Sequence, residues 1–472
     1  MKTLENMKKI INAVSKRSTR NVLGSLVMMT LVIALFNSAS FPVVVAQIKK
    51  IQKMILDGVV FSHDPEVVYH REEILNDYQN RISDEFSIPA NLRDRVGFWF
   101  DIYTRYDSNK KVVHHAMYPW IVFKVIDISH IINAETPKAR WMRNMKADDF
   151  VDEEIKKIKQ AMKSLADGQD VDDENPYQVA IAKAFENVEG SLQENAQDAL
   201  KNIRSQTGQK NFFAEGVEVS PLYLSGMEEI FRNHKLPVEL TRIPFVESSF
   251  NRHAVSKVGA SGIWQFMDYT GKSFMTVNDH IDERNSPFKA TDAAARLLKE
   301  NHMILKRSWP MAITAWNHGP SGIRRAAKAA ESEDLGVIIA NYQSKTFDFA
   351  SSNFYCEFLA ALYAEKYHEQ IYKDLQYEKT LDLHTVKLAR AISAKELLRR
   401  SGLAKEDFVM YNPDLKKALD RNVAIPSGFS LMVDTPARLV LKSLLTKDTR
   451  ADEDTKITQN DDFESTSAIS KN

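Results

Sequence analysis

One glutamate, Glu247, stands in a sequence context that favours acid–base chemistry. Residues 238–246 carry apolar side chains at helical spacing after a proline, and proline is suited to the first turn of a helix. Glu247 then falls near the helix end, beside Phe245 and Phe250. Because a carboxylate is costly to ionise among apolar groups, we expect a raised pKa at Glu247. A carboxylic acid of raised pKa is the group that protonates the leaving oxygen in glycosidic cleavage.

Two arginines near Glu247 support a different interpretation. A glutamate at a helix end commonly forms a salt bridge, and Arg242 or Arg252 could be its partner. Pro244 lacks an N–H group, so we expect it to disturb the last helical turn. The spacing alone leaves the catalytic and the ion-pair interpretations of Glu247 open.

The segment 258–267 favours the catalytic interpretation. It holds Gly262 and another glycine shortly before it, and glycines allow a backbone to approach a ligand closely. Trp264 and Phe266 would offer apolar surface to a sugar ring, and Gln265 would offer both a hydrogen-bond donor and an acceptor. We therefore expect this segment to contact a sugar.

Several segments resemble the signature blocks of the family 1 lytic transglycosylases in order and in spacing. They read ESSFN at 247–251, GASGIWQFM at 259–267 and AWNHG at 315–319. Between them, the segments at 281–284 and 291–298 resemble the membrane-bound lytic transglycosylase D branch of that family. The resemblance is specific over residues 236–362, about a quarter of the chain.

The resemblance implies a mainly α chain with a lysozyme-like (goose-type, SLT) catalytic domain over residues 211–375. It implies an enzyme that acts on peptidoglycan glycan strands with the first-block glutamate, here Glu247, as its sole acid/base. Protonated Glu247 would donate to the oxygen between N-acetylmuramic acid and N-acetylglucosamine, while the substrate's N-acetyl group stabilises the positive sugar centre. Glu247 would then accept the proton of the muramoyl 6-hydroxyl, which closes a 1,6-anhydro ring.

The resemblance also assigns substrate-binding residues. They are Ser256, Gly262, Gln265, Phe266, Met267, Trp316, Asn317, and Phe354 or Tyr355. Trp316 replaces the usual tyrosine of the third block, which keeps an aromatic surface and loses a hydroxyl. A later family motif falls at 350–354, where Asn353 is retained and the family glutamate is absent. The sequence leaves open whether Phe354 or Tyr355 supplies the aromatic group of that motif.

Two other functions remain open. A hydrolase of the same fold would often use a second carboxylate at roughly 5–9.5 Å from the first. Asp268 follows the second block directly and is the candidate to watch, although it also suits a helix cap. The missing glutamate of the last motif keeps a catalytically weak peptidoglycan-binding scaffold possible.

The composition excludes other classes of function. Lys+Arg and Asp+Glu are equal at 63 each, so the chain lacks the basic excess typical of a nucleic-acid binder. Cys356 is the single cysteine, so no internal disulfide can form, and we expect it to be a buried core residue. The histidines lack metal-ligand spacing and no nucleotide-binding motif occurs, so we expect no metal and no cofactor.

The N-terminus carries an export signal. A basic segment over 1–21 precedes an apolar run at 22–36, which is short for a membrane span and suits a signal peptide. We expect residues 1–46 to be a signal peptide cleaved after Ala46, or else an uncleaved anchor that tethers the chain to the inner membrane. Both place the rest of the chain in the periplasm or cell envelope.

The remaining segments predict the domain organisation. We expect a mostly helical region over 47–210. A hairpin near 96–127, whose strands flank a polar turn at 107–109, interrupts it. The chain should be helical again over 138–207, apart from a loop at 167–176. Residues 376–440 resemble a degenerate LysM module, a glycan-binding unit, whose usual opening is missing. A helical cap on the catalytic domain is the alternative for this segment. We expect the polar tail over 441–472 to be disordered.

Overall fold

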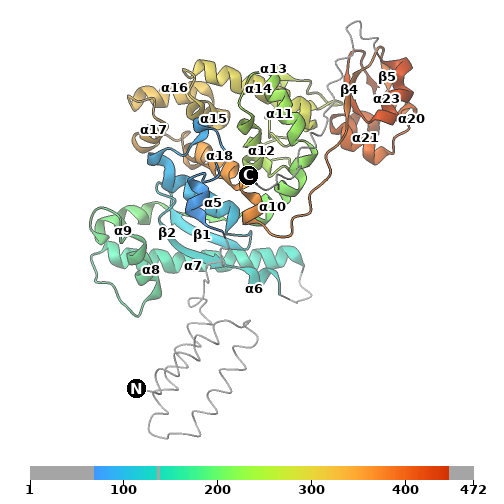
Figure 1. Ribbon diagram of the computed structural model, residues 1–472. Coiled ribbons are helices and arrows are strands. Elements are labelled where there is room, and N and C mark those ends of the chain that lie inside the picture. The colour runs from blue at the N-terminus through green and yellow to red at the C-terminus, as the bar shows by residue number, and fades with distance from the viewer. Residues whose placement is uncertain (1–68, 135–138, 446–472) are drawn as a thin grey trace, which may run out of the picture. The chain divides into compact units, whose positions relative to one another are not determined.

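The computed structural model describes residues 69–134 and 139–445, and Figure 1 shows their helices and strands. The predicted signal peptide or anchor and most of the predicted polar tail lie outside the described residues. Helices dominate the described residues, which confirms the mainly α class. None of the helices in these ranges is both long and apolar enough to cross a lipid bilayer.

A small antiparallel sheet separates two hydrophobic cores in the first half of the chain. Its strands are β1 (Lys110–His115), β2 (Val122–Asp127) and β3 (Ile203–Thr207), in the order β2-β1-β3. Successive strand residues point to opposite faces of a sheet. Accordingly, Val112 packs into the core that contains α5 (Arg93–Thr104), and Val113 packs into a second core. Figure 1 shows β1 and β2 between α5 and α7.

The predicted hairpin forms within 96–127, but its first strand and its turn lie elsewhere than expected. Residues 96–104 are the helix α5, and the polar turn at 107–109 joins α5 to β1. The hairpin turn instead connects β1 to β2 after His115. Nine of the 12 α5 residues are buried, so burial on nearly all sides of a helix overrides the β-propensity of its aromatic residues.

Helices cover the outer face of the sheet and form the second core. They are α6 (Ser129–Ile132), α7 (Arg140–Ala166), α8 (Pro176–Ala184) and α9 (Leu192–Lys201). The gap between α7 and α8 confirms the predicted loop. The prediction of helix up to residue 207 is wrong for β3, which pairs with β1.

Residues 210–371 form a helical assembly around α18. Its helices are α10 (Lys210–Val219), α11 (Leu224–Asn233), α12 (Ile243–Ser248), α13 (Asp268–Phe274), α14 (Pro287–Ile304), α15 (Trp309–His318), α16 (Pro320–Ala329), α17 (Leu335–Asn341), α18 (Phe349–Lys366) and α19 (His368–Ile371). α18 packs against α5, α12 and α15. A helix that is apolar on all sides belongs in a core, and 13 of the 18 residues of α18 are buried.

The segment before Glu247 is two short helices rather than one. A 3-10 helix spans Val238–Arg242, and α12 begins at Ile243. Pro244 therefore sits in the first turn of α12, where its missing N–H costs nothing, and not in the last turn as expected.

The C-terminal module has its own core and a strand–helix–strand order that agrees with the sequence prediction. Its elements are β4 (His384–Lys387), β5 (Ile392–Ser393), α20 (Ala394–Ser401), α21 (Lys405–Tyr411), α22 (Lys416–Arg421), β6 (Ala424–Ile425), β7 (Ser430–Val433) and α23 (Thr435–Leu441). β4 pairs antiparallel with β7, and Asn412 exchanges two hydrogen bonds of 2.8 Å with the backbone of Met432 in β7. Leu441 and Leu444 are buried in this core, so the ordered module continues past residue 440.

Candidate active site

Glu247 lies at the end of a helix whose start is anchored by buried charges. Arg242 donates through Nε to Glu365 at 3.0 Å and also binds Glu228. Arg252 donates instead to a tyrosine hydroxyl 3.5 Å away. Both arginines therefore have other partners, and Glu247 forms no ion pair within the part of the chain that the structure describes.

The backbone turns sharply after Glu247 and ties the first two sequence blocks together. Ser249 and Phe250 have positive φ angles of 49° and 56°, so α12 ends in a left-handed turn. Ser248 donates through Oγ to the carbonyl of Ile263 at 2.8 Å. The first block therefore lies directly on the turn that the second block forms.

Trp316 of the third block contacts the Glu247 carboxylate. Its indole Nε1 donates to Oε1 at 2.8 Å, and its ring packs edge-on against Phe266, with 5.1 Å between ring centroids. Glu247 is half-buried, and burial raises its pKa to about 7, while the hydrogen bond from Trp316 opposes this rise. Near neutral pH, the carboxyl group can therefore act first as a proton donor and then as an acceptor.

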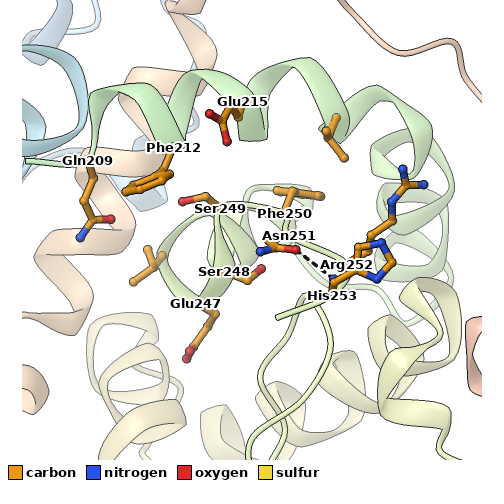
Figure 2. A pocket seen from close by; sticks show the side chains of 12 residues that line it. Gln209, Phe212, Glu215, Glu247, Ser248, Ser249, Phe250, Asn251, Arg252 and His253 are labelled. Carbon is orange, nitrogen blue, oxygen red and sulfur yellow. Dashed lines mark hydrogen bonds between the residues drawn. The ribbon is translucent and has the colours of Figure 1, made fainter. Parts of the chain in front are cut away.

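Glu247 borders a pocket of about 640 Å³ between α10 and the turn after α12. Figure 2 shows Phe212 and Glu215 on the α10 side and Arg252 and His253 at the other end of the pocket from Gln209. The Glu247 side chain points away from α10 in this view, and its carboxylate accepts a hydrogen bond from Trp316. The carboxylate therefore faces away from α10 and contacts the third sequence block.

The second block forms a tight loop behind this carboxylate. Gln265, with a φ of 50°, donates through Nε2 to the carbonyl of Gly262 at 2.7 Å, and Ser256 accepts through Oγ from a backbone N–H at 2.9 Å. Gly262 is required because a Cβ atom there would lie 1.9 Å from the carbonyl oxygen of Arg284. Met267 is 43% exposed. Ser256, Gly262 and Gln265 thus shape the loop, and Met267 presents surface to solvent.

Four aromatic residues expected to contact a sugar lie in the core instead. Trp264, Phe266, Phe354 and Tyr355 are 0–3% exposed. Their apolar rings gain more free energy from burial in the core than they would from facing a groove. Trp316 is the half-buried aromatic residue that contacts Glu247.

The end of α15 meets the start of α18. Asn317 is exposed and accepts through Oδ1 from Ser351 Oγ at 2.9 Å. The same hydroxyl lies 3.2 Å from Nδ1 of His318. The third block and the segment matching the later motif are therefore joined.

The blocks that meet at Glu247 belong to a known domain. Residues 228–337 match the family model for the Transglycosylase SLT domain. This chain contains an SLT domain. The resemblance to the family 1 lytic transglycosylases is thereby confirmed, and the match covers Glu247, Gln265, Trp316 and Asn317.

Two similar proteins each match about a fifth to a quarter of this chain. The chain is 30% identical over 98 residues to the membrane-bound lytic murein transglycosylase D of Escherichia coli (strain K12). This alignment covers 21% of this chain and 22% of that protein. It is 35% identical over 112 residues to a putative tributyltin chloride resistance protein of Alteromonas sp. (strain M-1). This alignment covers 24% of this chain and 53% of that protein. The chain thus spans about a fifth to a half of the length of these relatives.

The crystal structure of the 70 kDa soluble lytic transglycosylase of Escherichia coli aligns with a TM-score of 0.25 at 15% identity, over 51% of this chain and 46% of that chain.

The structure adds a second carboxylate that the sequence prediction missed. Glu357, on α18 outside the SLT match, is half-buried and makes no hydrogen bond or ion pair to the described residues. Burial raises its pKa to about 8, the negative charge of Glu247 raises it as well, and Arg204 lowers it. The only sequence signal was its spacing of seven residues after Ala350, two helical turns from the position of the absent family glutamate.

Tyr103 adds a hydroxyl group that the sequence prediction also missed. It lies on α5, 1% exposed, and packs against α10 through Phe213 with 5.1 Å between ring centroids. Its pKa is raised by burial and then by the negative charges of Glu357 and Glu247. No motif marks Tyr103, because only tertiary packing brings α5 next to the SLT domain.

The structure also shows the surroundings of Asp268 and Cys356. Asp268 begins α13, is exposed and pairs with Lys272 at 2.7 Å, so it serves the helix rather than Glu247. Cys356 is fully buried, as expected, and burial raises the pKa of its thiol to about 12. Within residues 69–134 and 139–445, no three or more His, Cys, Asp or Glu side chains gather as metal ligands would.

Proposed function

We propose that this chain is a peptidoglycan lytic transglycosylase of the cell envelope. It cleaves the β-1,4 bond between N-acetylmuramic acid and N-acetylglucosamine and leaves 1,6-anhydromuramoyl ends. The observation that carries the proposal is the half-buried, ion-pair-free carboxyl group of Glu247, with Trp316 donating to one oxygen, inside an SLT domain.

Glu247 supplies both proton transfers of the proposed reaction. Trp316 donates to Oε1, so Oε2 is the oxygen that carries the transferable proton. Oε2–H protonates the glycosidic oxygen as the bond to C1 breaks, and the N-acetyl oxygen of the muramoyl residue stabilises the positive C1. The carboxylate then takes the proton of the 6-hydroxyl, whose oxygen bonds to C1. No water is consumed, and Glu247 returns to its protonated form.

The groove residues have supporting roles in this proposal. Ser256 and Gln265 hold the loop beside Glu247, and Met267, Trp316 and Asn317 present the surface along which the sugar rings lie. The C-terminal module, which resembles LysM, adds glycan-binding surface. The relative from Escherichia coli is described as membrane-bound, and the basic and apolar N-terminus of this chain supports a similar envelope location.

Glu357 favours a second candidate function, a hydrolase of the same fold. A carboxylate near Glu247 could activate water against C1, which would yield reducing ends. Glu357→Gln separates the two functions, because it would abolish a hydrolase that uses this base and spare formation of anhydro ends.

Digestion of purified peptidoglycan, with products read by mass spectrometry, tests the proposal. We expect anhydro ends from the chain and none from Glu247→Gln. Reducing ends that require Glu357 would establish the hydrolase. Binding to the wall without cleavage by any variant would establish a scaffold.

A further inference from the structure

The C-terminal module is fixed to the SLT domain by buried charges. Nζ of Lys289, on α14, lies 2.7 Å from Oδ2 of Asp414 and 2.9 Å from Oε1 of Glu283. The Asp414 side chain is 1% exposed, and Ile281 of the SLT domain packs into the core of the module. A buried ion pair is costly to separate. The module is therefore a fixed wall beside the SLT domain and not a loosely attached domain.

A second pocket, of about 630 Å³, lies between this wall and the SLT domain. Arg252 and His253 line it, and both also line the pocket that Glu247 borders. Figure 2 shows them at the end of the Glu247 pocket opposite Gln209. The two pockets therefore adjoin at Arg252 and His253.

The module contributes apolar and cationic groups to the second pocket. Val409, Met410 and Pro413 are half-buried on its wall, and Lys416 and Lys417 are exposed at the start of α22. Neither lysine forms an ion pair with any residue in the described ranges.

The unpaired charge of this pocket is positive. Two of its acidic residues, Asp282 and Asp414, are already bound by Arg284 and Lys289. Glu406 is the remaining acidic residue of the pocket lining, which also holds the basic residues Arg252, Lys416 and Lys417. The pocket is thus built for an anion with small apolar groups.

We propose that this second pocket binds the peptide stem carried by the muramoyl residues of a peptidoglycan strand while the glycan lies along Glu247. Such stems are short acidic peptides with aliphatic side chains, which match the lysines and the apolar wall. The rival occupant is the glycan itself, but none of the residues lining the pocket is Trp, Tyr or Phe, the side chains with large apolar ring faces on which a sugar can stack. This inference rests on the proposed function, because it takes peptidoglycan as the substrate.

Charge reversal in the full chain tests the proposal. We compare Lys416→Glu/Lys417→Glu with a matched pair in the same module, Lys387→Glu/Lys395→Glu, which are exposed, lack ion pairs among the described residues and lie outside the pocket. The substrates are stem-bearing peptidoglycan strands and the same strands stripped of stems by an amidase. We expect the ratio of kcat/KM on stem-bearing to stem-free strands to fall about tenfold in the pocket variant, mainly through KM, and to stay unchanged in the matched pair.

A ratio that does not change in the pocket variant, whether both activities fall equally or neither falls, overturns the inference. Binding separates its failure from that of the proposed function. In a Glu247→Gln background, calorimetry with a soluble disaccharide-peptide should give about tenfold weaker binding for the pocket variant, with a loss that shrinks at high salt. If the unmodified chain cleaves neither substrate but this binding difference holds, the proposed function falls and the peptide site stands. Equal binding with and without the two pocket substitutions would contradict the peptide site.

Discussion

The indole Nε1 of Trp316 donates a hydrogen bond of 2.8 Å to Oε1 of Glu247. This contact joins the third sequence block to the first and gives the carboxyl group two unlike oxygens. It also stabilises the ionised form, so it lowers a pKa that burial raises. The two opposed effects leave Glu247 able to change protonation state within one turnover.

Removing the Trp316 donor should impair the first proton transfer, because that step leaves Glu247 ionised and the hydrogen bond stabilises the ionised form. Trp316→Phe keeps an aromatic ring and leaves Oε1 without its donor, so we expect kcat to fall by roughly 10- to 100-fold, as for the loss of a hydrogen bond to a charged group. The pKa of Glu247 should rise further, which moves the basic limb of the pH–rate profile to higher pH. Trp316→Tyr, which restores a hydroxyl donor, should recover part of the activity. An unchanged profile in Trp316→Phe would mean that this hydrogen bond has no role in the reaction.

Ionised Glu247 should destabilise the folded state at neutral and basic pH. Its pKa is about 7 in the folded chain against an ordinary value of 4.5, so the folded state holds the proton more tightly than the unfolded state. The stabilising effect of this proton is complete below pH 4.5 and is lost as the pH rises toward 7. We expect Glu247→Gln to raise the free energy of unfolding at pH 8 by at most about 3 kcal/mol, since part of the side chain remains in solvent.

Thermal unfolding across pH measures this effect. The gain of Glu247→Gln over the unmodified chain should vanish near pH 4. Glu215→Gln, which removes an exposed glutamate of the same pocket, is the matched control variant. A gain that is the same at all pH values would point to packing rather than to protonation.

Arg242 should be far more important for stability than its neighbour Arg232. Both bind Glu228, but the side chain of Arg242 is 3% exposed and also pairs with the buried Glu365, whereas that of Arg232 is 58% exposed. Arg242→Ala strands a buried carboxylate, so we expect a loss of about 3–5 kcal/mol in chemical denaturation. Arg232→Ala should cost about 0–1 kcal/mol. Similar losses in the two variants would contradict the anchoring role of Arg242.

The two glycines of the second block should differ in their tolerance of alanine. Both have positive φ, but a Cβ at Gly262 would lie 1.9 Å from the Arg284 carbonyl oxygen, whereas nothing lies within 4 Å of one at Gly259. Gly259→Ala should cost only the backbone strain of about 1–2 kcal/mol. Gly262→Ala should cost more and should lower activity, because the loop behind Glu247 must move. Denaturant melts and peptidoglycan turnover compare the pair, and equal effects would contradict the close approach at Gly262.

The sequence predicted the part of the site that local patterns encode. Glu247, Trp316 and Asn317 belong to recognisable blocks, and the structure brings these blocks together. Whether the other side chains face the site or the core depends on burial, which these local patterns do not encode. Phe266 looks like a sugar platform in the sequence, but it lies in the core, since an apolar ring beside a turn can face either way.

Residues outside the blocks were not predictable in the same way. Residues 96–104 look like a strand because aromatic residues are common in strands, yet a helix surrounded by other helices has the same composition. Glu357 and Tyr103 approach Glu247 only through the packing of α18 and α5, and such long-range contacts leave no periodic trace in the sequence.

The most direct test of the central claim follows the oxygen atoms. Peptidoglycan is digested in water enriched in heavy oxygen, and the new chain ends are read by mass spectrometry. If Glu247 drives ring closure by the muramoyl 6-hydroxyl, the new ends are 1,6-anhydro, contain no heavy oxygen, and are absent with Glu247→Gln. New reducing ends that each carry one heavy oxygen would contradict the account, because water and not the substrate's own hydroxyl would then have attacked C1.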